Sequence, residues 1–450
     1  MANTQDMTKG PIAPILLKFT LPIFLGDMFQ QFYNIVDSII VGRTLGANAL
    51  AAVGSTGTLM FLIVGVSTTL ANGFAVVTAQ KFGAKDKDGV HVSFANGLIQ
   101  TIIISGIISA ISLLFIKKLL VLMNTPEDIY NDACLYISII IEGLIITSLY
   151  NYFAASLRSV GNSRIPLYFL ILASFINIFL DQYFIVKLNM GTDGASKATV
   201  ISQFVSALFC FIYIYTKEPG LRPGIKDFKM DKEICLKQLE IGVPMALQNA
   251  ITASGTVIMQ SATNIFGSTV VAANTAAGKV RMLFTQPLMS LNSSVASYCG
   301  QNYGSGDYDR VRQGVKISAI MATVYSVVAT VLANLLLPAA IHLFITDESS
   351  IEAMMPWAKT YMMIASCFIF FLGYVFVYRA ALQSCGHSVY AMGAGIIEFL
   401  ERLVFAALAI HYKSYILAVL CDCSAWAMGG LFLIISFYVF DHKKKLFKNR

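Results

Sequence analysis

Long apolar segments separated by short polar turns form the main pattern of this 450-residue chain. A helix needs about 20 mostly apolar residues to cross the hydrocarbon core of a bilayer, and each segment reaches that length. Turn-forming sequences such as LGAN, NTPED and YGSGD fill the connections between the segments. The segments lie near residues 14–41, 48–78, 92–117, 131–154, 165–187, 193–215, 238–264, 269–298, 315–345, 355–381, 389–411 and 414–440. The pattern predicts an all-α polytopic membrane protein with twelve transmembrane helices.

The composition supports this class of protein. The chain is 56% hydrophobic and only 13% charged, with a mean hydropathy of +0.69. A soluble protein carries about 25% charged residues, so the soluble class is excluded. The eight cysteines are scattered and imply no disulfide framework, and the five histidines show no metal-binding spacing. We expect a multi-pass protein of the cell membrane, embedded in the lipid bilayer.

The basic residues predict the orientation in the membrane. The net charge of +7 resides mainly in the connections between spans, so it indicates topology and no nucleic-acid partner. If the N-terminus is cytoplasmic, 22 of the 32 Lys and Arg residues fall on the cytoplasmic side and seven fall outside. Because Lys and Arg are enriched in cytoplasmic loops, we expect both termini to be cytoplasmic.

The chain also repeats itself. Residues 80–86 match residues 301–307 at an offset of 221, and residues 155–163 match residues 380–388 at an offset of 225. Each half holds six spans, so both halves enter the membrane from the same side. The repeat is therefore parallel, with its axis along the membrane normal.

This duplication predicts two six-helix lobes. The N-lobe comprises residues 1–216, with the first six spans. A charged cytoplasmic loop, residues 217–237, joins the lobes. The C-lobe comprises residues 238–450, with the last six spans and a basic cytoplasmic tail.

The first span is apolar on one face and polar on the other. Asp27, Gln31, Asn34 and Asp37 fall on one stripe of the helix. A carboxylate at the bilayer centre costs about 2.5–3.5 kcal/mol, so this stripe must face protein or a water-filled cavity. It serves either a buried structural hydrogen-bond network or a proton or cation site on a transport path.

Polar residues of four N-lobe spans fall at one depth, in the outer half of the membrane. They are Asp37, Tyr136, Asn177, Asp181 and Thr199. Two carboxylates in one dry pocket cannot both ionise cheaply without a cation, so at least one should bind a proton readily. The alternative ion is Na⁺, which suits carboxylate, amide and hydroxyl oxygens. A static network remains the structural alternative. Glu142 is a further cavity acid to consider.

The C-terminal half differs, because its seventh span has Gln248 but no acid. Its charged residues near mid-depth are Lys279, Arg281, Glu398, Glu401 and Arg402. Glu398 and Arg402 are spaced i, i+4 and can pair directly. The cluster is either a mutually neutralising structural group or part of a substrate site. The candidate substrate-cavity residues are Asp27, Gln31, Asn34, Asn151, Gln248 and Glu398.

The chain resembles the multidrug and toxic compound extrusion (MATE) family. The resemblance rests on PIFLGDMFQQFYNIVDSIIVGRTLGANALAAVG in the first span, LRSVGNS, LQSCGHS, GTDGASKAT and the loops at 80–86 and 301–307. It implies a two-lobe, cation-coupled exporter of organic, mainly cationic, compounds that works by alternating access. The family's N-lobe cation site falls on the same five residues, Asp37 to Thr199. One family Asn falls on Ala154, with Asn151 one turn away. The seventh and tenth spans lack the acids of some sodium-coupled members, so no C-lobe cation site is expected.

Two other functions, a lipid-linked saccharide flippase and a membrane enzyme, are the alternatives to a cation-coupled exporter. A flippase for a lipid-linked saccharide would use basic residues such as Lys279, Arg281 and Arg402 to hold a diphosphate. A membrane enzyme is disfavoured because the chain has no GxSxG, HExxH or Gly-rich phosphate loop. We therefore expect a transporter of small organic substrates, coupled to H⁺ or Na⁺, with no cofactor. The sequence implies no oligomer.

Overall fold

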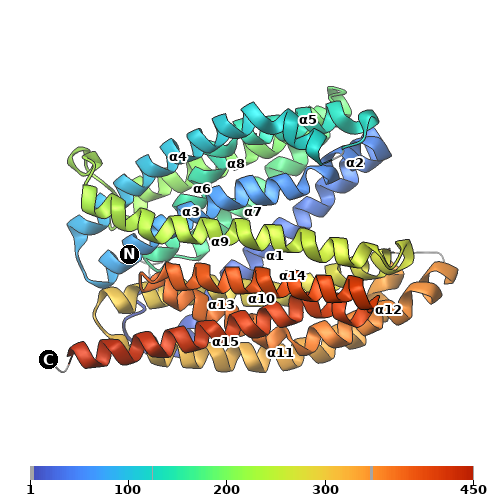
Figure 1. The fold of residues 1–450 in the computed structure, drawn as a ribbon. Helices are drawn as coiled ribbons and strands as arrows, with labels where there is room; N and C mark the ends of the chain where they lie inside the picture. Colours follow the sequence, from blue (N-terminus) through green and yellow to red (C-terminus); the bar gives the residue numbers. More distant parts are fainter. Residues whose placement is uncertain (1–4, 124, 345–347, 449–450) are drawn as a thin grey trace. The chain divides into compact units, whose positions relative to one another are not determined.

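The computed structural model describes residues 5–123, 125–344 and 348–448, and helices connected by short loops make up nearly all of this part of the chain (Figure 1). No strand occurs within these ranges. The predicted basic tail ends in residues 449–450, which lie outside them. The helices are α1 (Ile12–Leu45), α2 (Ala47–Ser55), α3 (Gly57–Gly83), α4 (Lys87–Leu122), α5 (Glu127–Glu142), α6 (Leu144–Ser159), α7 (Arg164–Asp181), the π-helical turn η1 (Gln182–Lys187), α8 (Thr192–Lys217), the 3₁₀ turn η2 (Ile225–Phe228), α9 (Lys232–Asn264), α10 (Ser268–Gly304), α11 (Tyr308–Phe344), α12 (Glu348–Cys367), α13 (Ile369–Ser384), α14 (Ser388–Tyr412) and α15 (Tyr415–Lys448).

These helices form twelve long segments in the described ranges, which confirms the predicted number of spans. The count takes α2–α3, α5–α6, α7–η1 and α12–α13 each as one segment. Seven segments are apolar and long enough to cross a membrane by length and composition, or nine if the bent pairs α5–α6 and α12–α13 each count as one span. The other three segments, α9, α10 and α14, are more polar and include Gln248, Arg281 and Glu398.

The backbone repeats in the two halves as the sequence does. Gly46 and Gly267, 221 residues apart, have φ angles of 91° and 90°. Gly161 and Gly386, 225 residues apart, have φ angles of 89° and 82°. The fourth span bends by 48° between α5 and α6, and its counterpart bends by 42° between α12 and α13. The same local geometry at matched positions shows that the duplication extends to structure.

The chain folds into two compact units. The first comprises residues 1–10, 18–249 and 300–306, and the second comprises residues 11–17, 250–299 and 307–450. Helices α1, α9 and α10 each contribute residues to both units. The predicted lobe boundaries at residues 216 and 238 stay a prediction.

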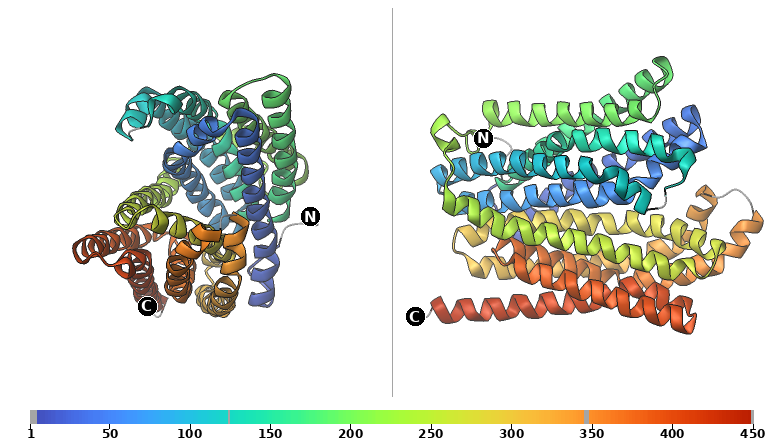
Figure 2. Two further views of the ribbon diagram at one scale, coloured as in Figure 1. Left: turned by 90° about the vertical axis from the view of Figure 1, so that its right-hand side faces the viewer. Right: turned by 45° about the horizontal axis from the view of Figure 1, so that its top comes forward.

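The first unit is built around a cluster of large aromatic side chains. Phe94 of α4 lies against Tyr152 and Phe153 of α6, with ring centroids 5.6 and 6.2 Å away. The Tyr152 hydroxyl donates to the Phe94 carbonyl at 2.8 Å, so the buried phenol keeps a partner. Figure 2 shows these helices side by side in both views. This core holds α4 and α6 together and positions the rest of the unit.

The second unit packs on small residues instead. Ala273, Ala276 and Ala277 of α10 are buried with Ala333 of α11 and Ala358 of α12. Small side chains let membrane helices approach closely, which supplies the packing that the hydrophobic effect cannot give in lipid. The unit is therefore held by close helix contact as well as by the polar pairs described below.

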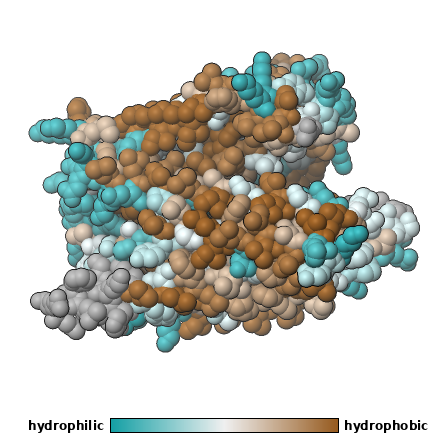
Figure 3. All heavy atoms as spheres, viewed as in Figure 1, coloured by the Kyte–Doolittle hydropathy of each residue, from teal (hydrophilic) through white to brown (hydrophobic). Residues whose placement is uncertain are grey.

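Apolar side chains cover the exposed flanks of the helices in each unit (Figure 3). On α4 Ile103, Ile107 and Leu114 are exposed, and on α11 Val324 and Val331 are exposed. A water-soluble protein rarely exposes apolar patches of this extent. Such flanks fit the hydrocarbon of a bilayer.

Connections from distant parts of the chain meet at one end of the first unit. The Met7 N–H donates to Gln301 Oε1 at 3.0 Å, and Gln301 Nε2 donates to the Ser159 carbonyl at 2.9 Å. The Gln5 N–H donates to the Gly161 carbonyl at 3.0 Å. The N-terminal segment thus ties the loop after α6 to the end of α10.

The loop between α8 and α9 is anchored at the same end. Asn96 of α4 donates to the carbonyls of Asp227 and Lys229, at 3.4 and 3.3 Å, and accepts from the Asp231 N–H at 2.8 Å. Gln238 of α9 donates to the Ser93 carbonyl at 2.8 Å. The N-terminal segment, the loop after α6, the loop between α8 and α9 and the end of α10 therefore lie at one end of this unit.

Candidate functional site

Two carboxyl groups face each other in the first unit. Asp181 is the last residue of α7 and is fully buried, and the chain widens into the π-helical turn η1 directly after it. Asp37 lies on α1 and is half-buried. The two groups are close enough that a proton on one would be shared with the other in a hydrogen bond. Single π-helical turns often mark functional positions, and this one sets the direction of Asp181.

Two buried tyrosines complete this cluster. Tyr136 of α5 is 4% exposed and lies close enough to both carboxyl groups to interact electrostatically. Tyr33 of α1 does the same and also contacts Gln203 of α8. Sequence analysis predicted Tyr136 but missed Tyr33 and Gln203. The signal for Tyr33 was present, because it lies one helical turn before Asp37.

The polar atoms of this cluster are unusually short of partners. Among the described residues, no hydrogen-bond partner reaches Asp37 Oδ1, either carboxylate oxygen of Asp181, or either side-chain amide atom of Asn177. Buried polar groups are nearly always hydrogen-bonded, so each such group calls for an explanation. Asn177 lies one turn before Asp181 on α7 and is 1% exposed. Four oxygen atoms and one amide nitrogen are thus available to a small cation or to water.

Three other predicted residues, Thr199, Asn151 and Asp27, each contact a different part of the first unit. Thr199 of α8 is half-buried and donates to the Ala195 carbonyl at 3.1 Å, so its oxygen still has accepting capacity. Asn151 of α6 donates to the Thr147 carbonyl at 2.8 Å. Asp27 of α1 interacts electrostatically with Arg158 of α6, an arginine assigned to a loop by sequence.

The remaining cavity candidates differ in how far their side chains are buried. On α1, Gln31 is half-buried and Asn34 is exposed, whereas Gln248 of α9 is buried. Glu142 is exposed. Within the described ranges, no three His, Cys, Asp or Glu side chains lie close enough together to hold a metal ion.

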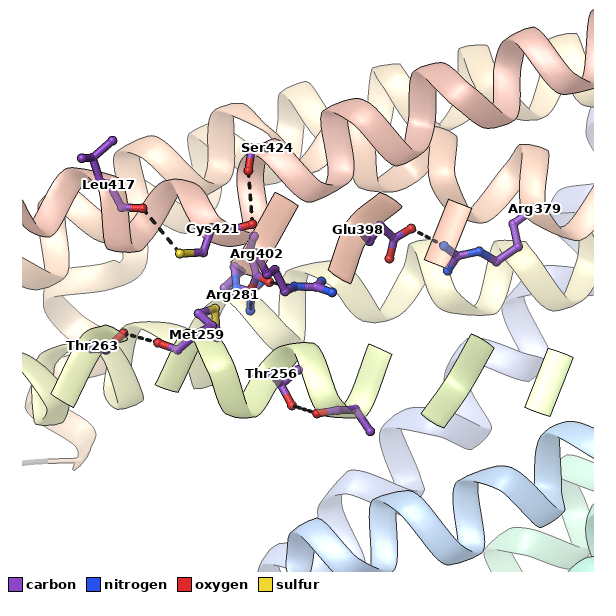
Figure 4. A network of polar contacts seen from close by, with 12 residues as sticks. Thr256, Met259, Thr263, Arg281, Arg379, Glu398, Arg402, Leu417, Cys421 and Ser424 are labelled. Carbon is purple, nitrogen blue, oxygen red and sulfur yellow. Dashed lines mark hydrogen bonds and ion pairs between the residues drawn. The ribbon is translucent and has the colours of Figure 1, made fainter. Parts of the chain in front are cut away.

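The charged cluster of the second unit differs from the sequence prediction. Glu398 of α14 pairs with Arg379 of α13 (Figure 4). Arg402 Nε of α14 donates to Asp422 Oδ1 of α15 at 2.9 Å. The predicted i, i+4 pair of Glu398 with Arg402 is therefore wrong. Each of these side chains finds an opposite charge on a neighbouring helix, which satisfies it better than a partner on its own helix surface.

Sequence analysis missed Asp422 and the pairing of Arg379. Asp422 lies between two cysteines in an apolar span, and Arg379 lies near the end of α13. Both are buried, at 8% and 9% exposure. An isolated charge in an apolar span needs a partner at the same depth, and this was the available signal.

The architecture and these buried charges define a multi-pass helical membrane protein with duplicated halves. The chain belongs to the MatE family, whose model matches residues 22–182 and 244–408, one match in each half. Members of this family are membrane transporters, not enzymes. The family membership predicted from sequence resemblance is confirmed.

Two curated relatives and one solved structure illustrate the similarity. The chain is 26% identical over 451 residues to the probable multidrug resistance protein YoeA of Bacillus subtilis (strain 168), covering 98% of this chain and 96% of YoeA. It is 27% identical over 412 residues to the probable multidrug resistance protein YpnP of the same organism, covering 90% of each. It shares its fold with an outward-facing multidrug resistance MATE family transporter of the MOP superfamily, with a TM-score of 0.89, 22% identity, and coverage of 99% of this chain and 98% of that one.

Proposed function

We propose that this protein is a cation-coupled antiporter that exports organic, mainly cationic, compounds by alternating access. The relatives described as multidrug resistance proteins support export of small molecules. The coupling ion, H⁺ or Na⁺, binds between Asp37 and Asp181.

The observation that carries this proposal is the pair of buried carboxyl groups whose oxygens lack donors in the described part of the chain. Two ionised carboxylates in one dry site repel each other, so the site holds a proton or a metal cation more readily than either acid alone. A static network would instead surround each oxygen with donors. The arrangement supports a site that is loaded and emptied during the transport cycle.

Tyr136, Asn177 and Thr199 supply the other ligands of this site. A phenol, an amide and a hydroxyl offer neutral oxygens, which suit Na⁺ and also a protonated carboxyl group. Loading removes the repulsion between Asp37 and Asp181 and allows α1 to approach α7. Substrate release and inward return of the cation follow from this change in charge.

The test is transport of ethidium into everted vesicles, whose cytoplasmic face is outside, driven separately by an imposed pH gradient and by an imposed Na⁺ gradient. Asp37→Asn and Asp181→Asn should each reduce gradient-driven transport to background, because asparagine keeps the shape but neither exchanges a proton nor attracts Na⁺. Asp128→Asn is the control, since it removes an exposed acid from the first turn of α5, the helix that carries Tyr136. The gradient that drives transport in the wild type identifies the ion.

Membrane abundance of each variant is measured in parallel. Full gradient-driven efflux by both asparagine variants at normal abundance would refute the site. Failure of the wild type to respond to either gradient would refute the cation coupling.

A further inference from the structure

Two arginine side chains of the second unit share one carboxylate. Arg402 Nε of α14 donates to Asp422 Oδ1 at 2.9 Å, and Arg281 Nη2 of α10 lies 3.6 Å from Asp422 Oδ2. Figure 4 shows Arg281 and Arg402 next to each other. The neighbouring pair of Arg379 with Glu398 is balanced by itself. The cluster of Arg281, Arg402 and Asp422 therefore contains two positive charges and one negative charge.

The guanidinium groups retain unused donors. In the described ranges, Arg402 Nη1 and Arg281 Nε have no hydrogen-bond partner. The Arg402 side chain is 4% exposed, so its unused donor lies inside the protein. A buried charge is expensive unless it is paired and hydrogen-bonded, and here one positive charge has no opposite charge of its own.

The cluster is held in a fixed geometry and is not sealed. The Arg281 guanidinium carbon lies 5.0 Å from the ring centre of Trp426 and 5.9 Å from that of Tyr361, as in cation–π contacts. A Cβ at Gly255 of α9 would lie 3.0 Å from Arg402 Nη1, so the α9 backbone confines that side chain. The Arg281 side chain is 19% exposed, which leaves a route to it.

The depth of the cluster limits what can reach it. Arg281, Arg402 and Asp422 lie 13, 10 and 7 residues from the nearer ends of their helices, which is about 10–20 Å at 1.5 Å per residue. In a helix whose end lies at the membrane surface, such positions are below the level of the lipid head groups. A substrate that enters the protein is better placed than a lipid to bring an anion here.

We propose that Arg281 and Arg402 bind an anionic group, a carboxylate or phosphate, of the exported substrate. A guanidinium group presents two parallel N–H donors that match two oxygens of such a group. Asp422 contacts both arginines and so fixes the orientation of both guanidinium groups. This inference rests on the proposed function and narrows its substrate class. The substrates would be zwitterionic amphiphiles, which pair a positive group with an acidic one.

The test measures anion binding by the purified full chain in detergent, using benzoate as the probe and benzamide as its neutral isostere. Benzoate should raise the melting temperature of the wild type by about 2 °C or more at saturation, and benzamide should not. Arg281→Met should weaken the benzoate response about tenfold, because a charge-assisted hydrogen bond is lost. It should still fold, since the remaining Arg402–Asp422 pair is balanced in charge.

Lys359→Met serves as the matched control. Lys359 is an exposed positive charge on α12, two residues from Tyr361, and its removal should leave the benzoate response unchanged. If Arg281→Met does not fold, Arg281→Lys replaces it. Lysine keeps the charge but loses the fork, so a clear weakening of the benzoate response is expected there too.

Three outcomes would overturn the proposal. They are equal benzoate responses in the wild type and the Arg281 variants, no benzoate response in the wild type, and an Arg281-dependent response to phosphatidylglycerol in place of benzoate. The last would assign the cluster to a lipid head group. Cation-driven ethidium efflux without benzoate binding would refute only this inference, whereas benzoate binding without cation-driven efflux would refute only the proposed function.

Discussion

Individual buried charges are neutralised differently in the two units. Glu398 and Asp422 each contact an arginine on a neighbouring helix. In the described part of the chain, Asp37 and Asp181 form no ion pair with a basic side chain and interact with each other. A buried acid that pairs with arginine keeps its charge, whereas two facing acids depend on a mobile cation. The first arrangement favours a stable fold, and the second favours a change of state.

The Arg379–Glu398 pair gives a prediction for stability. Arg379→Met or Glu398→Gln alone leaves one buried charge without its partner, which costs about 3–5 kcal/mol in unfolding free energy. The double variant removes both charges and should recover most of that loss. Unfolding of the purified protein in detergent, followed by circular dichroism, measures all three.

The comparison pair for this experiment is Glu398→Gln with Arg402→Gln. These residues have separate partners, so their losses should be more nearly additive than those of Arg379 and Glu398. A strong coupling between Glu398 and Arg402, with none between Glu398 and Arg379, would contradict the pairs described above.

At the scale of the helices, the start of α4 shows how a polar loop fixes a long span. Asp86 is the N-cap, and its Oδ1 accepts from the Gly89 N–H at 2.9 Å while its Oδ2 accepts from Lys81 Nζ at 2.8 Å. The bond from Lys81, followed by the bond from Gly89, lowers the pKa of the Asp86 carboxyl below its usual range. The carboxylate form therefore stabilises the folded state.

This cap predicts a pH dependence of stability. Asp86→Ala should lower the unfolding free energy by about 1 kcal/mol near neutral pH, mainly through the lost cap. The Lys81 pair adds little because the Asp86 side chain is 40% exposed. Because the pKa is lowered in the folded state, the contribution is complete above the unfolded pKa of about 4 and is lost as the pH falls through the lower folded value.

Urea unfolding of the wild type and Asp86→Ala across this pH range measures the difference. It should be constant above about pH 5 and shrink below about pH 4. Asp88→Ala removes an exposed acid in the same helical turn and serves as the control. A wild-type advantage that stays unchanged at the lowest pH would show that the charge of Asp86 is not its source.

The helices also show how far sequence reasoning reaches. The positions of Asp37, Tyr136 and Asp181 along their spans follow from the distance to the nearest turn, so their common depth could be predicted. The partners of Glu398 and Arg402 could not be, because they depend on how α13, α14 and α15 rotate against one another. Spacing along one helix identifies only partners on that helix, and here the neighbouring helices offered better ones.

At the scale of the whole molecule, the contacts between loops constrain the topology. The loops at 79–91, 156–164, 216–237 and 299–314 carry most of the basic residues between spans, which predicts that all four are cytoplasmic. Contacts within the first unit now link them: Gln301 bonds Ser159, Asn96 bonds Lys229, and a Cβ at Gly83 would lie 1.8 Å from the Gln301 carbonyl oxygen. Loops in contact lie on one side of the membrane, so they share a single orientation.

That orientation is predicted to be cytoplasmic, and cysteine labelling tests it. In a background without the eight native cysteines, Ile225→Cys places a thiol at a position that is 95% exposed. Asp128→Cys places one at an exposed position in the predicted extracellular turn before α5. An impermeant maleimide should label Asp128→Cys in intact cells and Ile225→Cys only after permeabilisation, because the basic loops face the cytoplasm. Since both sites are exposed, a lack of labelling reports the membrane barrier and not burial in the protein. The opposite result at both positions would invert the orientation and place Asp37 and Asp181 in the inner half of the membrane, where they would load the cation from the cytoplasm.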